Sequence, residues 1–147
     1  MQKMSNADYA KYIETISPKS KIGMNLIRAF FVGGAISGFG EGLFLLFCHF
    51  GAEVETARGI VIVALIFLGA GLTCLGVYDK LTNFGKAGAL VPITGFANAV
   101  VSPAMEYKAE GHIAGIGAKM FSVAGPVLVY GALAAMLYGL VLALIGS

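Results

Sequence analysis

Four polar residues lie inside or beside long hydrophobic segments, where their chemistry matters most: Glu41, Lys86, Thr94 and Asn98. A carboxylate at membrane depth costs at least ~2.5 kcal/mol unless it is protonated, paired or hydrated, so Glu41 is a functional candidate by default. The structural alternative is a neutral acid that is hydrogen-bonded to a neighbouring helix. Lys86 offers a positive charge, and the other two residues offer hydrogen bonds. The set therefore predicts a pore or solute path through the membrane, with these residues as its polar contacts.

The residue sets of common enzyme classes are missing from the sequence. It has no Ser-His-Asp arrangement, phosphate-cradling loop, dinucleotide fingerprint or histidine pair at metal-ligand spacing. Cys48 and Cys74 lie in hydrophobic segments, and we interpret them as buried thiols rather than as a disulfide or a zinc site. We expect no enzyme activity, no cofactor and no metal site. An intramembrane hydrolase is the least favoured alternative.

The composition is that of an integral membrane protein. Hydrophobic residues make up 58% of the 147 residues and charged residues only 12%, which lies outside the range of soluble globular domains. Three ranges carry no charge at all, and each exceeds the ~18 apolar residues that indicate a membrane span: 59–77, 87–105 and 120–147. The sequence predicts an all-α integral membrane protein.

We expect a cytoplasmic N-terminal tail, residues 1–25, followed by one membrane domain, residues 26–147. The domain should contain three to four hydrophobic segments, at about 26–50, 59–77, 85–102 and 120–145. Hydrophobic spacing over residues 5–16 predicts a short amphipathic helix, with a mobile polar tail as the alternative. Five of the ten basic residues lie within the first 28 positions, which by the positive-inside rule places the N-terminus in the cytoplasm.

The segment 85–102 is predicted to be broken or re-entrant. Pro92 has no backbone N–H and biases the preceding Val91 towards an extended conformation, so a helix should break or begin there. Broken backbone survives in a bilayer only where protein or a water-filled cavity satisfies the freed groups. We therefore predict a solute path whose backbone includes Gly88, Pro92 and Gly95 and whose polar contacts are the four residues named above. A kinked spanning helix without a site is the alternative.

Small residues recur every four positions in the first and last hydrophobic segments, at Gly34, Gly38 and Gly42 and at Gly131, Ala135 and Gly139. Such stripes let helices approach closely, either within one chain or in an oligomer. Because each residue of an α-helix is rotated by ~100° from the one before, Glu41 lies in the row of residues directly beside the first stripe. We therefore expect Glu41 to face a helix interface or an aqueous path rather than lipid.

Residues 75–111, with the sequence LGVYDKLTNFGKAGALVPITGFANAVVSPAMEYKAEG, resemble the stage V sporulation protein A family. The similarity extends from FFVGG at residues 30–34, through GVY at 76–78 and VPITGF at 91–96, to EG at 110–111. It covers most of the chain beyond the N-terminal tail. The VPITGF block is its most specific part.

This resemblance implies a membrane channel or channel subunit that moves dipicolinic acid, with calcium, across the forespore or spore inner membrane. Uptake would occur during sporulation and release during germination. It also implies partners from the same family, a soluble dipicolinate-binding AD protein and an AE membrane protein, within a homo- or hetero-oligomer. The alternative is a non-conducting structural or assembly subunit of that complex. No long basic patch in the sequence suggests nucleic acid as a partner.

Overall fold

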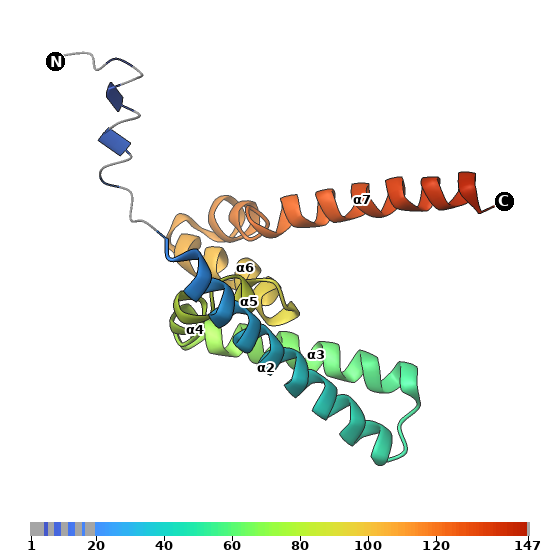
Figure 1. Ribbon diagram of the computed structural model, residues 1–147. Helices are drawn as coiled ribbons and strands as arrows, with labels where there is room; N and C mark the ends of the chain where they lie inside the picture. Colours follow the sequence, from blue (N-terminus) through green and yellow to red (C-terminus); the bar gives the residue numbers. More distant parts are fainter. Residues whose placement is uncertain (1–4, 6–7, 10–11, 14–15, 17–19, 147) are drawn as a thin grey trace.

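The computed structural model describes residues 5, 8–9, 12–13, 16 and 20–146, which form helices and turns with no strand among them (Figure 1). The prediction of an all-α membrane protein is confirmed. The amphipathic helix predicted over residues 5–16 falls largely outside the residues that the structure describes.

Three helices are long and apolar enough to cross a bilayer: α2 (Ile22–His49), α3 (Val54–Cys74) and α7 (Ala124–Ile145). They overlap the expected segments 26–50, 59–77 and 120–145. Helix α3 begins at Val54, before the charge-free range 59–77. Part of the connection between the expected segments 26–50 and 59–77 is therefore helical. Glu55 lies in the first turn, where a carboxylate complements the helix dipole.

Helices α2 and α3 form an antiparallel hairpin joined by a tight turn. Gly51 adopts a φ of +87° in this turn, and its N–H donates to the Cys48 carbonyl oxygen. The two helices pack against each other at Gly40, where a Cβ atom would lie 3.2 Å from Leu65 Cδ1. The absence of a side chain at Gly40 therefore helps the spanning helices to pack.

The central segment consists of three short helices: α4 (Tyr78–Gly85), α5 (Ala87–Leu90) and α6 (Ile93–Glu106). Pro92 separates α5 from α6 and has an extended ψ of 164°. The expected extended conformation of Val91 is wrong, because Val91 stays in the αR region, where its N–H bonds to the Ala87 carbonyl oxygen. The break therefore falls on the proline itself.

Helix α6 runs parallel to α3. Gly69 of α3 lies against Thr94, and Thr73, one turn further along α3, bonds to Asn98, one turn further along α6. A segment that crossed the membrane after α3 would run antiparallel to it. Residues 78–106 therefore enter the helix assembly and leave it at the same end, which makes the segment re-entrant.

The end of α4 and the short helix α5 pack on α2. A Cβ atom at Gly85 would collide with Val32, and one at Gly88 would collide with the backbone of Ala29. After α5, Pro92 lines the same cavity as Ser37, which lies about midway along α2. The backbone thus breaks about midway along α2 and beside the last two turns of α3, where Thr94 meets Gly69.

Helix α7 extends away from the other helices (Figure 1). It follows a 3₁₀ turn, η1 (Tyr107–Glu110), and a π-helical turn, η2 (His112–Gly117). Every described residue from Pro126 to Gly146 is exposed, so α7 is held only at its start.

Candidate functional site

A buried hydroxyl pair holds the two halves of the broken segment together. The Tyr78 hydroxyl lies 2.8 Å from the Ala89 carbonyl oxygen and 2.8 Å from Thr94 Oγ1. Because a phenol has one hydrogen and a carbonyl only accepts, Tyr78 donates to Ala89 and the Thr94 hydroxyl donates to Tyr78. These bonds tie α4 to α5 and to the first turn of α6.

Tyr78 is only 1% exposed and is the largest fully buried side chain among the described residues. It lies outside the three spanning helices. Burial raises the pKa of its phenol above the usual value of 10.0, and the hydrogen bond with Thr94 lowers it. The neutral phenol can therefore donate its hydrogen bond at physiological pH.

A second polar contact joins α3 to α6. The Thr73 hydroxyl lies 2.7 Å from the Gly69 carbonyl oxygen and 3.0 Å from Asn98 Oδ1, so its hydrogen is shared between the two acceptors. At the same interface, a Cβ atom on Gly69 would lie 2.7 Å from the Thr94 carbonyl oxygen. The two backbones meet there without side chains between them.

Thr94 and Asn98, two of the predicted solute contacts, thus have partners within the chain. Thr94 is 7% exposed, and no buried side-chain nitrogen or oxygen in the described part of the chain lacks a hydrogen bond. Their role as solute contacts stays a prediction. Sequence reasoning missed Tyr78 and Thr73, although the four-residue spacing of Gly69 and Thr73 was a signal for a close polar helix contact.

The two glycines among the predicted backbone residues lie where space is short. Gly88 packs against Ala29 and Gly33, and a Cβ atom at Gly95 would collide with the Leu90 carbonyl oxygen. Only glycine fits at these positions without a shift of the backbone. The break at Pro92 therefore depends on the glycines on both sides of it.

The two small-residue stripes are not packed within the chain. A Cβ atom on any of their five glycines would meet no atom of a described residue within 4 Å: Gly34, Gly38, Gly42, Gly131 and Gly139. Ala135 is also exposed. The contacts of α2 within the chain use Gly33 and Gly40 instead. Packing of the stripes against another subunit stays a prediction.

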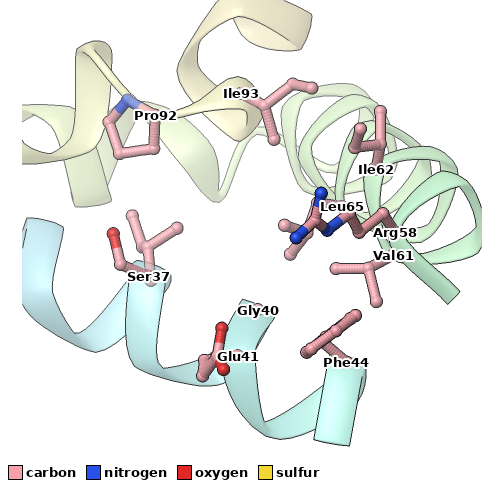
Figure 2. Close-up of a pocket in the computed structure, with 11 residues that line it drawn as sticks. Ser37, Gly40, Glu41, Phe44, Arg58, Val61, Ile62, Leu65, Pro92 and Ile93 are labelled. Atoms are coloured by element: carbon pink, nitrogen blue, oxygen red, sulfur yellow. The ribbon is translucent and has the colours of Figure 1, made fainter. Parts of the chain in front are cut away.

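A cavity of about 530 Å³ opens between the C-terminal half of α2 and the N-terminal half of α3, with Pro92 and Ile93 at its base (Figure 2). We call it the outer hollow, after the side that it would occupy if the N-terminus is cytoplasmic. Glu41 lines it from α2 and Arg58 lines it from α3. Glu41 is exposed and borders the hollow, and its place at a helix interface or an aqueous path stays a prediction.

A second cavity of about 240 Å³, the inner hollow, lies near the start of α2. Asn25, Ala29 and Lys86 are among its lining residues. Lys86 joins α4 to α5 with a φ of 51° and a ψ of −130°, a conformation that favours glycine. The structure therefore separates two of the predicted site residues, placing Lys86 in the inner hollow and Glu41 in the outer one.

The two cysteines are free thiols. Cys48 is half-buried, but Cys74 is exposed at the end of α3, so the prediction that both are buried is wrong for Cys74. The reason is that the preceding residue, Thr73, faces α6, and Cys74 lies about 100° further round the helix. Among the described residues, no group of three His, Cys, Asp or Glu side chains could hold a metal ion.

Spanning helices around a broken re-entrant segment define a polytopic helical membrane protein. Residues 25–141 match the family described as SpoVAC/SpoVAEB sporulation membrane protein, and the chain belongs to this family. It is 40% identical over 135 residues to stage V sporulation protein AC of Bacillus subtilis (strain 168), covering 91% of this chain and 90% of that protein. No solved structure matches. The resemblance inferred from the VPITGF block is confirmed.

Proposed function

We propose that this sporulation membrane protein is a channel or channel subunit that moves dipicolinic acid, with calcium, across the spore inner membrane. Uptake would take place during sporulation and release during germination. The observation that carries the proposal is the position of the re-entrant break. Helix α5 and Pro92 lie between the inner hollow and the outer hollow, so a few residues of broken backbone separate two cavities.

The chemistry of this barrier suits an anion. Lys86 provides a positive charge on the inner side, where it would raise the local concentration of a dianion. In the first turn of α6, the N–H groups of Gly95 and Phe96 bond to the Pro92 carbonyl oxygen, whereas the N–H group of Ile93 precedes the intrahelical bonds, and Ile93 lies at the base of the outer hollow. Transporters built from discontinuous helices use such groups at membrane depth. The family membership supports a role in sporulation, and it suggests the AD and AE proteins as partners.

The direction of α6 supports a definite topology. If the N-terminus is cytoplasmic, α3 returns the chain to the cytoplasm, and the re-entrant segment keeps residues 107–119 there. Lys108 and Lys119 in this loop agree with the positive-inside rule. Helix α7 would then place the C-terminus outside. A cysteine at position 109 that reacts with external reagents in sealed, right-side-out vesicles would contradict this topology.

Solute flux tests the proposed function. Dipicolinate release from liposomes should be faster with the reconstituted chain, alone or together with its AE partner, than with protein-free liposomes. Several of the single cysteines placed between Gly88 and Asn98 at positions other than the glycines, above all at the exposed Leu90 and Val91, should react with water-soluble thiol reagents and then slow the flux in a chain lacking Cys48 and Cys74. Flux that continues unchanged after these cysteines are modified would place the path in another subunit.

A non-conducting assembly subunit is the second candidate, and the exposure of α7 favours it. Together with the unpacked glycine stripes, this helix leaves a large surface that another membrane protein could cover. Under this alternative, deletion of α7 would abolish assembly of the complex. Modification of the cysteines at 88–98 would leave transport by the assembled complex intact.

A further inference from the structure

The lining of the outer hollow includes one basic residue, Arg58. Arg58 lies in the second turn of α3, and Figure 2 shows its guanidinium group pointing towards the interior of the cavity. We propose that Arg58 is the anion-binding residue of the outer hollow and contacts a carboxylate group of the solute. This proposal rests on the proposed function and adds a residue and a binding site to it.

The present partner of Arg58 leaves it available. Arg58 Nη1 lies 3.4 Å from Glu55 Oε1, and the two side chains are 62% and 80% exposed. Such an exposed pair contributes little to stability. A guanidinium has five N–H donors in a planar fork, so one long contact leaves the geometry free for a two-point bond to a carboxylate.

The walls of the hollow increase the effect of this charge. Apart from the charged residues, they are mainly apolar: Ile36, Phe44, Val61, Ile62 and Leu65. Low-dielectric walls focus the field of a charge into the cavity. Arg58 is therefore placed to attract an anion more strongly than an equally exposed arginine on an open surface.

Three ionisable groups lie in or beside the outer hollow, namely Glu41 on α2 and Glu55 and Arg58 on α3. The part of α6 that lines it adds only Ile93, after the linker residue Pro92. Arg58 is thus the only basic residue in the described lining. Replacement by glutamine leaves acidic groups alone in the hollow, so the hollow should attract anions less and cations more than it does with Arg58 in place.

Modification of a cysteine in the hollow measures this preference without any need for transport. Ser37→Cys, in a full-length chain lacking Cys48 and Cys74, places a thiol in the lining. The measurement is the ratio of its reaction rates with an anionic and a cationic methanethiosulfonate reagent. In water, one unit charge at roughly 10 Å changes the rate of a singly charged reagent about twofold. Arg58→Gln should slow the anionic reagent and speed the cationic one, so the ratio should fall about fourfold. Glu55→Gln should raise the ratio, because it frees the guanidinium.

Protection by dipicolinate tests the two-point bond. Dipicolinate should slow modification of the cysteine at position 37 in the chain with Arg58 and have no effect in Arg58→Gln. Arg58→Lys should keep the rate ratio but lose most of the protection, since an ammonium group lacks the planar fork. Lys108→Gln, which removes one positive charge from an exposed loop at the other end of the molecule, is the matched control and should change neither quantity.

The possible outcomes separate the binding site from the proposed function. An unreactive cysteine at position 37, or equal rate ratios and equal protection with and without Arg58, would overturn the site. If one of these outcomes overturns the site and Arg58→Gln also leaves dipicolinate flux unchanged, the channel proposal still stands. Protection that depends on Arg58 in a chain without flux would support the binding site and refute conduction by this chain.

Discussion

Replacing Tyr78 by phenylalanine is the most direct test of how the re-entrant segment is held. The change removes one oxygen atom and keeps the ring, so packing around this buried side chain is preserved. The Ala89 carbonyl oxygen loses its bond from the phenol, and the Thr94 hydroxyl loses its acceptor. We expect the three helices α4, α5 and α6 to separate more easily.

The size of the effect follows from these two bonds. A buried group left without its partner costs about 1–3 kcal/mol in soluble proteins, whereas side-chain bonds in a membrane protein average about 0.6 kcal/mol. Because both partners of Tyr78 are buried, we expect Tyr78→Phe to lower the free energy of unfolding by about 1–2 kcal/mol. Thr94→Val should lower it by a similar amount. The double variant should lose less than the sum, because the two residues share a bond.

Unfolding of the purified chain in mixed micelles of a mild detergent and dodecyl sulfate measures this loss. Tyr138→Phe is the matched control, since Tyr138 is 67% exposed on α7 and should change stability by less than about 0.5 kcal/mol. Proteolysis of residues 78–98 should become faster in Tyr78→Phe and should not change in Tyr138→Phe. Equal stability of the Tyr78 and Tyr138 variants would refute the role of this hydroxyl in holding the segment.

Three further predictions concern close contact, backbone strain and charge. Gly69→Ala should lower the free energy of unfolding by about 1–3 kcal/mol, because its Cβ atom would lie 2.7 Å from the Thr94 carbonyl oxygen. Gly71→Ala is the control: its Cβ atom would meet no atom within 4 Å, so it should be neutral or stabilising in the same assay. Lys86→Gly should relieve about 1 kcal/mol of backbone strain at φ 51° and should reduce dipicolinate flux because it removes the charge. Lys86→Glu should reduce flux more than Lys86→Gln, and normal flux in Lys86→Glu would contradict a role for this charge. Glu41→Gln should keep the chain folded and raise anion over cation permeability in liposomes, whereas unchanged assembly and flux in Glu41→Leu would place this side chain against lipid.

The fold class could be predicted from the sequence because hydrophobic length and charge-free runs are local properties. The break at Pro92 was predictable for the same reason, since the missing N–H belongs to the residue itself. The direction of α6 was not predictable. It depends on which residues of α3 it meets, and only the contacts of Gly69 with Thr94 and of Thr73 with Asn98 decide between a span and a re-entrant segment.

The break at Lys86 could not be predicted either, because lysine does not favour a positive φ. Its conformation is imposed by packing on both sides. Gly85 is pressed against Val32, and Gly88 is pressed against Ala29, so the linker between them must change direction within one residue. A tertiary constraint here overrides the local preference of the residue.

The candidate site shows how burial separates two uses of polar residues at membrane depth. Thr94 is buried with its hydrogen bond made inside the chain, and Asn98 bonds to Thr73, so these neutral groups stabilise the broken backbone. The charged groups instead line the hollows on either side of that backbone. Residue type alone predicted both as solute contacts, because a sequence shows that a group is polar but not whether its bonds are already made. Hydrogen-bonded neutral groups can hold a path open or closed, and charged groups that line a cavity can attract the solute that crosses it.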